Sequence, residues 1–163
     1  ADSLAGVLPT IRSRCVSFAI APVSPADCAR YCTAHGVDKK TAALYSELFD
    51  GHIGTVLTAA RDKARTEQVD KAMELARAAQ AGDSYTAAVL LAPYEKDKAG
   101  AAALLRDLRA VAAAGLQGSP HAPVQGQQAQ RTLRLAEAAI QRLGAQVNPK
   151  IVLTVFAARL AHA

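Results

Sequence analysis

Two arginines and a cysteine stand close together near the start of the chain. They belong to the stretch Leu8-Pro9-Thr10-Ile11-Arg12-Ser13-Arg14-Cys15, whose other members are small or apolar. A guanidinium is planar and permanently charged, so it can bind phosphate oxygens through two parallel hydrogen bonds. Such a group can neutralise the charge that develops on a phosphoryl group during its transfer. This stretch is therefore the first candidate for chemistry in the sequence.

Two further cysteines have the spacing of one of the two ligand pairs in a metal site. Cys28 and Cys32 are four residues apart on one face of a predicted helix, and His35 follows at the next turn. Three ligands in a row on one helix cannot surround a tetrahedral ion, so we expect buried or partly buried thiols and no bound metal. The sequence has no Walker A loop, no His-Glu-x-x-His and no Ser/His/Asp set in a credible context. We expect no cofactor, and no enzymatic activity from the isolated chain.

The composition favours closely packed helices. Of 163 residues, 51% are hydrophobic but only 4% are aromatic, with no Trp, which predicts an almost entirely α-helical chain. The net charge of +5 is compatible with an acidic partner or DNA but decides nothing. Three cysteines, an odd number, argue against a disulfide framework and fit a reducing compartment. With no signal sequence and no apolar run of the ~18 residues that a membrane helix needs, we expect a cytoplasmic protein without a membrane partner.

One strand and three short helices are predicted before residue 66. The segment Cys15–Ile20 alternates and is rich in β-formers, and the prolines at 22 and 25 close it. Helices are predicted from the N-cap Ser24 to Gly36, from Asp38 to Phe49, and from near Ile53 onward. A lone strand followed by helices is expected to be the last strand of a sheet whose other strands are not in this sequence.

About five helices are predicted for the remainder, which we interpret as one helical bundle. Helical periodicity covers 61–81, 84–93, 96–114, 129–147 and 149–162, with Gly115 expected to end the third and a loop over 117–128. In the fourth, an apolar seam recurs in steps of four and three: Ala129, Leu133, Ala136, Ile140, Leu143 and Val147. Arg131, Arg134 and Arg142 form its polar side, for which a solvated face or a subunit contact is preferred to DNA binding.

The motif Ser13-Arg14-Cys15 resembles the Ser-Arg-Cys motif of clamp-loader ATPases, and the whole octapeptide most closely resembles the delta-prime family of the bacterial DNA polymerase III clamp loader. The resemblance implies three domains: residues 1–21 as the end of an ATPase (AAA+) domain, 22–65 as a three-helix lid, and 66–163 as a helical collar for oligomerisation. It also implies that Arg14 is an arginine finger, which reaches in trans to the nucleotide of a neighbouring subunit. Arg12 is expected to make a structural or interface salt bridge, and Cys15 to pack as a small hydrophobic residue.

A second, weaker resemblance covers residues 43–57. Here a helix ends at Gly51 and the next begins His-Ile-Gly-Thr-Val-Leu, which is similar to the Ser-Ile-Gly-x-Ala-Leu of the family's lid. ATP-binding relatives carry a sensor arginine at the position of Gly54, and glycine cannot contact a phosphate through a side chain. The resemblance therefore implies a subunit that does not hydrolyse ATP. His52 is expected to be exposed and to cap the start of this helix.

The resemblance implies a role in DNA replication within the DNA polymerase III holoenzyme. The expected partners are the gamma/tau and delta subunits of the clamp loader, with the sliding clamp and primer-template DNA reached through the assembled complex. Two alternatives stay open. One is the gamma/tau ATPase subunit, which Gly54 disfavours. The other is an unrelated all-α adaptor or scaffold, in which the octapeptide is coincidence.

Overall fold

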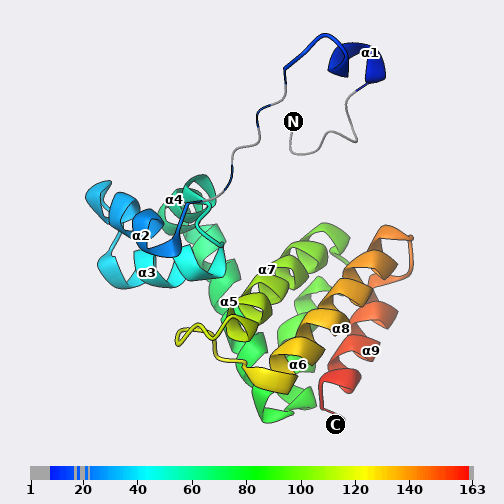
Figure 1. Ribbon diagram of the computed structural model, residues 1–163. Helices are drawn as coiled ribbons and strands as arrows, with labels where there is room; N and C mark the ends of the chain where they lie inside the picture. Colours follow the sequence, from blue (N-terminus) through cyan, green and yellow to red (C-terminus); the bar gives the residue numbers. More distant parts are fainter. Residues whose placement is uncertain (1–7, 17, 19–20, 22, 162–163) are drawn as a thin grey trace.

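The computed structural model describes residues 8–16, 18, 21 and 23–161. Within these residues the chain is all-α, as predicted, with nine α-helices, one short 3₁₀ helix and no strand. Figure 1 shows three parts: α1 (Pro9–Arg12) stands apart, α2 to α4 pack together, and α5 to α9 form a bundle. The bounds of the second group are α2 (Pro25–Ala34), α3 (Lys39–Leu48) and α4 (Ile53–Arg61).

The three-helix unit is defined by caps that the sequence predicts. The Ser24 side chain accepts a hydrogen bond from the backbone N–H of Asp27 at 3.1 Å, and Pro25 occupies the first helical position. Asp38 accepts from two N–H groups in the first turn of α3. Gly51, at φ +72°, ends the turn after α3, and a Cβ there would lie 1.8 Å from the carbonyl oxygen of Val23. The chain therefore needs glycine at this position for conformation and for space.

The bundle contains α5 (Lys63–Ala81), α6 (Ser84–Leu91), η2 (Ala92–Tyr94), α7 (Lys98–Leu116), α8 (Gly126–Gly144) and α9 (Pro149–Ala161). In it, α7 packs between α5 and α8, while α9 packs against α6 and α8. The predicted seam of α8 is confirmed over most of its length, because Ala129, Ala136 and Leu143 are buried and Leu133 and Ile140 are partly buried. Val147 lies beyond the end of α8 and is exposed.

The boundary between α4 and α5 differs from the sequence prediction. The continuous helical pattern starting at Arg61 is split at Asp62, which has an extended backbone and is the N-cap of α5. Its Oδ1 accepts a hydrogen bond from the backbone N–H of Ala64 at 2.9 Å. Such a cap satisfies donors that the first turn of a helix leaves free, so the chain can start a new helix in a new direction there.

Gly115 also differs from its predicted role, because it lies inside α7 instead of ending it. A Cβ at this position would lie 1.9 Å from the carbonyl oxygen of Val124, in the loop that leads to α8. Glycine is there because the returning backbone touches the helix. The loop itself is shorter than predicted, because α8 begins at Gly126.

Replacing Gly115 with alanine should therefore lower the free energy of unfolding by about 1–3 kcal/mol, because helix and loop must separate to admit the methyl group. Urea denaturation measures the change. Gly54→Ala is the matched control, since Gly54 is also helical and a Cβ there meets no atom within 4 Å. That control should be neutral or stabilising by about 0.5–1 kcal/mol. Equal effects of the two substitutions would mean that the contact with Val124 does not constrain the helix.

The strand predicted over 15–20 is not found at the described positions of that segment, Cys15, Val16 and Phe18. Residues 17, 19 and 20 lie outside the described residues. A strand needs a neighbour to pair its backbone N–H and C=O groups, and the described part of this chain supplies none.

Candidate functional site

A short helix and the turn after it position the arginine motif. Pro9 starts α1, and the backbone N–H groups of Ser13 and Arg14 bond to the carbonyls of Pro9 and Ile11, both at 3.0 Å. The Ser13 hydroxyl donates to the carbonyl of Thr10 at 3.1 Å. The Ser13 side chain thus stabilises the turn, and the turn fixes the position of the Arg14 backbone.

The motif lies on an exposed surface. Arg14 is exposed, and so is Cys15, which was predicted to pack as a hydrophobic residue. Apolar side chains around them are exposed as well: Leu8, Ile11, Val16 and Phe18, the last at 85%. The side chain of Arg12 lies outside the described part of the structure. A charged arginine amid so much uncovered apolar surface is typical of a contact region, so this segment is suited to meet an anionic group on another molecule.

Gly54 and His52 lie at the start of α4, away from α1 (Figure 1). Gly54 is exposed with open space where a Cβ would be, so packing does not explain the glycine. His52 is exposed at the N-cap position, as predicted, but its side chain makes no capping hydrogen bond. Position 54 therefore has room for a long side chain.

Cys28 and Cys32 are buried within the three-helix unit, as predicted. Burial, and next the neighbouring Cys28, raises the pKa of the Cys32 thiol to about 11. His35 is exposed instead, stacks on Tyr31 with ring centroids 4.0 Å apart, and has Nδ1 2.8 Å from the Tyr31 carbonyl. The three residues thus face different surroundings, and across the described chain no group of three or more candidate ligands is placed to hold a metal ion.

A charged cluster between α5 and α7 was not predicted from the sequence. Asp107 is buried and accepts hydrogen bonds from Arg65 Nη2 at 2.6 Å and from Gln68 Nε2 at 2.8 Å, with a second contact from Arg65 Nη1. The hydrogen bond with Asp107 is the main reason why the pKa of Arg65 is raised. The Arg65 guanidinium also lies over the Phe49 ring, 5.6 Å from its centroid. Arg65 thus connects the end of α3 to the bundle.

A second unpredicted contact joins the same two parts. Ser119, buried in the loop between α7 and α8, donates its hydroxyl to Glu47 at the end of α3. His121 Nε2 lies 4.0 Å from the other Glu47 oxygen. Together with the Arg65 cluster, this contact sets the position of the three-helix unit on the bundle.

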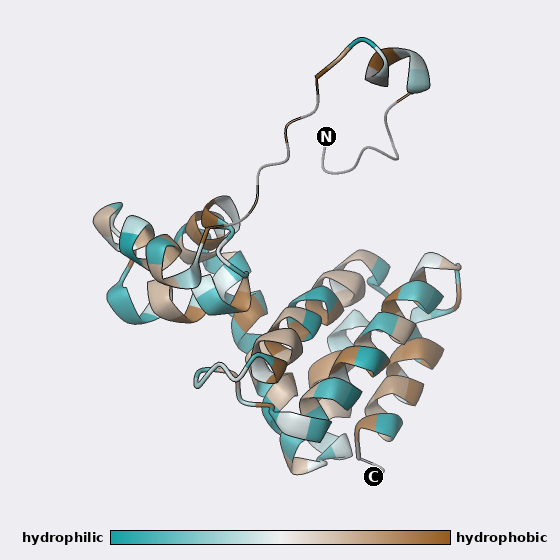
Figure 2. Ribbon diagram, in the orientation of Figure 1, coloured by the Kyte–Doolittle hydropathy of each residue, from teal (hydrophilic) through white to brown (hydrophobic). Residues whose placement is uncertain are grey.

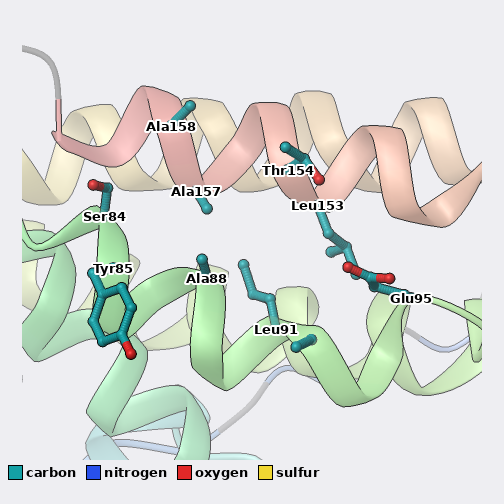
Figure 3. Close-up of a pocket in the computed structure, with 10 residues that line it drawn as sticks. Ser84, Tyr85, Ala88, Leu91, Glu95, Leu153, Thr154, Ala157 and Ala158 are labelled. Atoms are coloured by element: carbon teal, nitrogen blue, oxygen red, sulfur yellow. The ribbon is translucent and has the colours of Figure 1, made fainter.

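A mostly apolar groove lies between α6 and α9. Figure 3 shows Leu153 and Ala157 of α9 directed toward α6, in a groove of about 350 Å³. Glu95 is the charged residue in its lining, and it pairs with Lys150 at 3.3 Å. Figure 2 shows much of α9 coloured as hydrophobic, whereas the outer faces of α7 and α8 include many hydrophilic residues. This surface is suited to contact another apolar surface and not to catalyse a reaction.

Arg131, Arg134 and Arg142 do not act as one stripe. Arg131 Nη2 donates to the backbone carbonyl of Arg159 at 2.7 Å, so it ties α8 to α9. Arg134 and Arg142 are exposed. This arrangement fits the predicted solvated face for the latter two.

Comparison with known proteins adds no assignment. No protein-family model matches the chain, and neither a curated protein nor a solved structure matches it significantly. None of the helices in the described residues combines the length and the apolar character needed to cross a membrane.

Proposed function

We propose that this chain is the C-terminal part of a delta-prime-type clamp-loader subunit, which supplies an arginine finger in trans and does not hydrolyse ATP. The observation that carries the proposal is Arg14, exposed within the stretch Leu8–Cys15 that resembles the family's motif. The order of parts supports it, since a three-helix unit and then a helical bundle follow the motif. In this proposal residues 1–21 end an ATPase domain, 22–65 form the lid and 66–163 form the collar.

The chemistry of the finger follows from charge and reach. As the bond to a γ-phosphate breaks, negative charge spreads over its oxygens, and a guanidinium held against them stabilises the transition state. In the family that the motif resembles, the finger acts on a nucleotide held by a neighbouring subunit, and the proposal gives Arg14 the same role. The open space at Gly54 supports the proposal that this subunit does not hydrolyse ATP itself, since a sensor arginine would fit at this position but glycine stands there.

We place the main subunit contact of the collar on the α6–α9 face, defined by the exposed groove-lining residues Tyr85, Ala88, Thr154 and Ala158. The composition of this groove supports the placement, because most of its lining residues are apolar and burying apolar surface is favourable. The partners are the gamma/tau and delta subunits, with clamp and DNA engaged by the assembled cytoplasmic complex.

Co-elution tests the proposal. The chain, mixed with the gamma/tau and delta subunits from the same genome, should elute with them in size-exclusion chromatography. Ala88→Glu should abolish the complex because it places an unpaired charge among the apolar side chains of the groove, whereas Val147→Glu, at an exposed position off that face, should leave it intact. No co-elution by a folded chain would favour the unrelated helical adaptor.

A further inference from the structure

A groove between α7 and α8 has an apolar floor and a positively charged rim. Its volume is about 400 Å³, within the range of sites that bind small ligands or short peptide segments. The floor consists of Ala99, Ala102, Ile140, Leu143 and Gly144. Lys98 and Arg106, both on α7, complete the lining, which contains no acidic residue.

The charges of Lys98 and Arg106 are not neutralised within the described structure. No carboxylate among the described residues lies within ion-pair distance of either side chain. Lys98 Nζ donates to the Gln146 amide oxygen at 2.9 Å, and that partner is neutral. Both cations therefore remain available to an anionic ligand at the edge of the groove.

The nearby carboxylates are engaged elsewhere or lie outside the groove. Asp97 accepts from the backbone N–H of Gly100 at 2.9 Å as the N-cap of α7. Asp107 is buried and held by Arg65 and Gln68. Glu137, the acidic residue of α8, is exposed but does not line the groove. The groove therefore carries a net positive charge.

The spacing of the two cations matches an extended peptide. Lys98 and Arg106 are eight residues apart on α7, which corresponds to about 12 Å along a helix. In an extended chain, alternate side chains point to one side, and four residues span about 13 Å. Acidic side chains at the first and fifth positions would meet the two cations, and an aliphatic side chain at the third would enter the apolar floor between them.

We propose that the α7–α8 groove binds an extended acidic peptide segment of a partner protein, of the pattern acidic-x-aliphatic-x-acidic. This proposal does not rest on the clamp-loader assignment. A single-stranded nucleic acid fits less well, because no aromatic side chain lines the groove to stack on a base. Two cations also make a short rim and not a track for a phosphate backbone.

The test uses a fluorescein-labelled peptide, Ser-Glu-Ser-Leu-Ser-Glu-Ser, titrated with the whole chain at low ionic strength and followed by fluorescence polarisation. Binding should be saturable and should weaken as salt is added. Lys98→Glu and Arg106→Glu should each weaken binding by about tenfold or more. Arg134→Glu is the matched control, an exposed arginine of α8 outside the groove, and should change affinity by less than about twofold.

Two further measurements separate the apolar and ionic contributions. Ala99→Trp fills the groove from an exposed position while keeping both cations, and should abolish binding. A peptide with serine in place of leucine should bind at least about fivefold more weakly. Circular dichroism melts verify that each variant is folded. The proposal is overturned if the wild-type chain shows no saturable binding, if Arg134→Glu weakens binding as much as Arg106→Glu, or if oligothymidylate displaces the peptide and binds more tightly.

Discussion

Replacing Arg14 with alanine should lower the clamp- and DNA-stimulated ATPase rate of a reconstituted clamp loader by about 10³-fold or more, if Arg14 is the trans finger we propose. The guanidinium would be lost from the transition state while the nucleotide site on the neighbouring subunit stays intact. Arg14 is exposed, so its removal should not disturb folding. Steady-state ATP hydrolysis with saturating clamp and primer-template DNA measures the effect.

Two variants make that result specific. Arg14→Lys keeps the charge but not the planar, bidentate fork, so its rate should fall between those of wild type and Arg14→Ala. Arg134→Ala removes another exposed arginine, from α8, and should leave the rate unchanged. All variants should assemble equally by size-exclusion chromatography. An unchanged rate with Arg14→Ala in a fully assembled complex would contradict the finger.

Most helix starts could be predicted because a cap is a local bond. Ser24, Asp38, Asp83 and Asn148 each accept from a backbone N–H two or three residues ahead, so the sequence contains both partners. Asp62 makes the same kind of bond but was missed. It stands between Arg61 and Lys63, where the helical pattern continues across the boundary, and only the change of direction reveals the cap.

Features that depend on distant backbone could not be predicted. Gly115 was expected to end α7, because glycine commonly does so. Its actual role depends on the carbonyl of Val124, whose position follows from the path of the loop. The expected strand over 15–20 failed at its described positions for a related reason, because β-forming residues become a strand only beside another strand.

In the candidate site, too, the sequence could predict contiguous residues but not contacts between distant ones. Ser13, Arg14 and Cys15 are contiguous, so the sequence could single them out, but not the exposure of Cys15. The contacts that hold the three-helix unit on the bundle join residues far apart in the chain: Asp107 lies 42 residues from Arg65, and Ser119 lies 72 from Glu47. No local pattern marks such pairs. From sequence alone a charged residue such as Asp107 is assigned to the solvent-exposed surface, because its buried partner is known only from the fold.

Asp107→Ala should lower the free energy of unfolding by about 3 kcal/mol. The Asp107 side chain is 7% exposed and that of Arg65 is 25% exposed, so the guanidinium would be left largely desolvated without its acceptor. The Gln68 amide would lose its partner as well. Urea denaturation followed by circular dichroism at constant pH measures the change.

The matched control is Glu137→Ala, which removes an exposed carboxylate from α8 and should change stability by less than about 0.5 kcal/mol. A double variant, Arg65→Met with Asp107→Leu, should recover part of the loss, because it removes both charges and fills the space with apolar atoms. If Asp107→Ala is no worse than Glu137→Ala, the cluster does not stabilise the bundle. Full recovery in the double variant would instead mean that the pair fixes the geometry between α5 and α7 more than it adds stability.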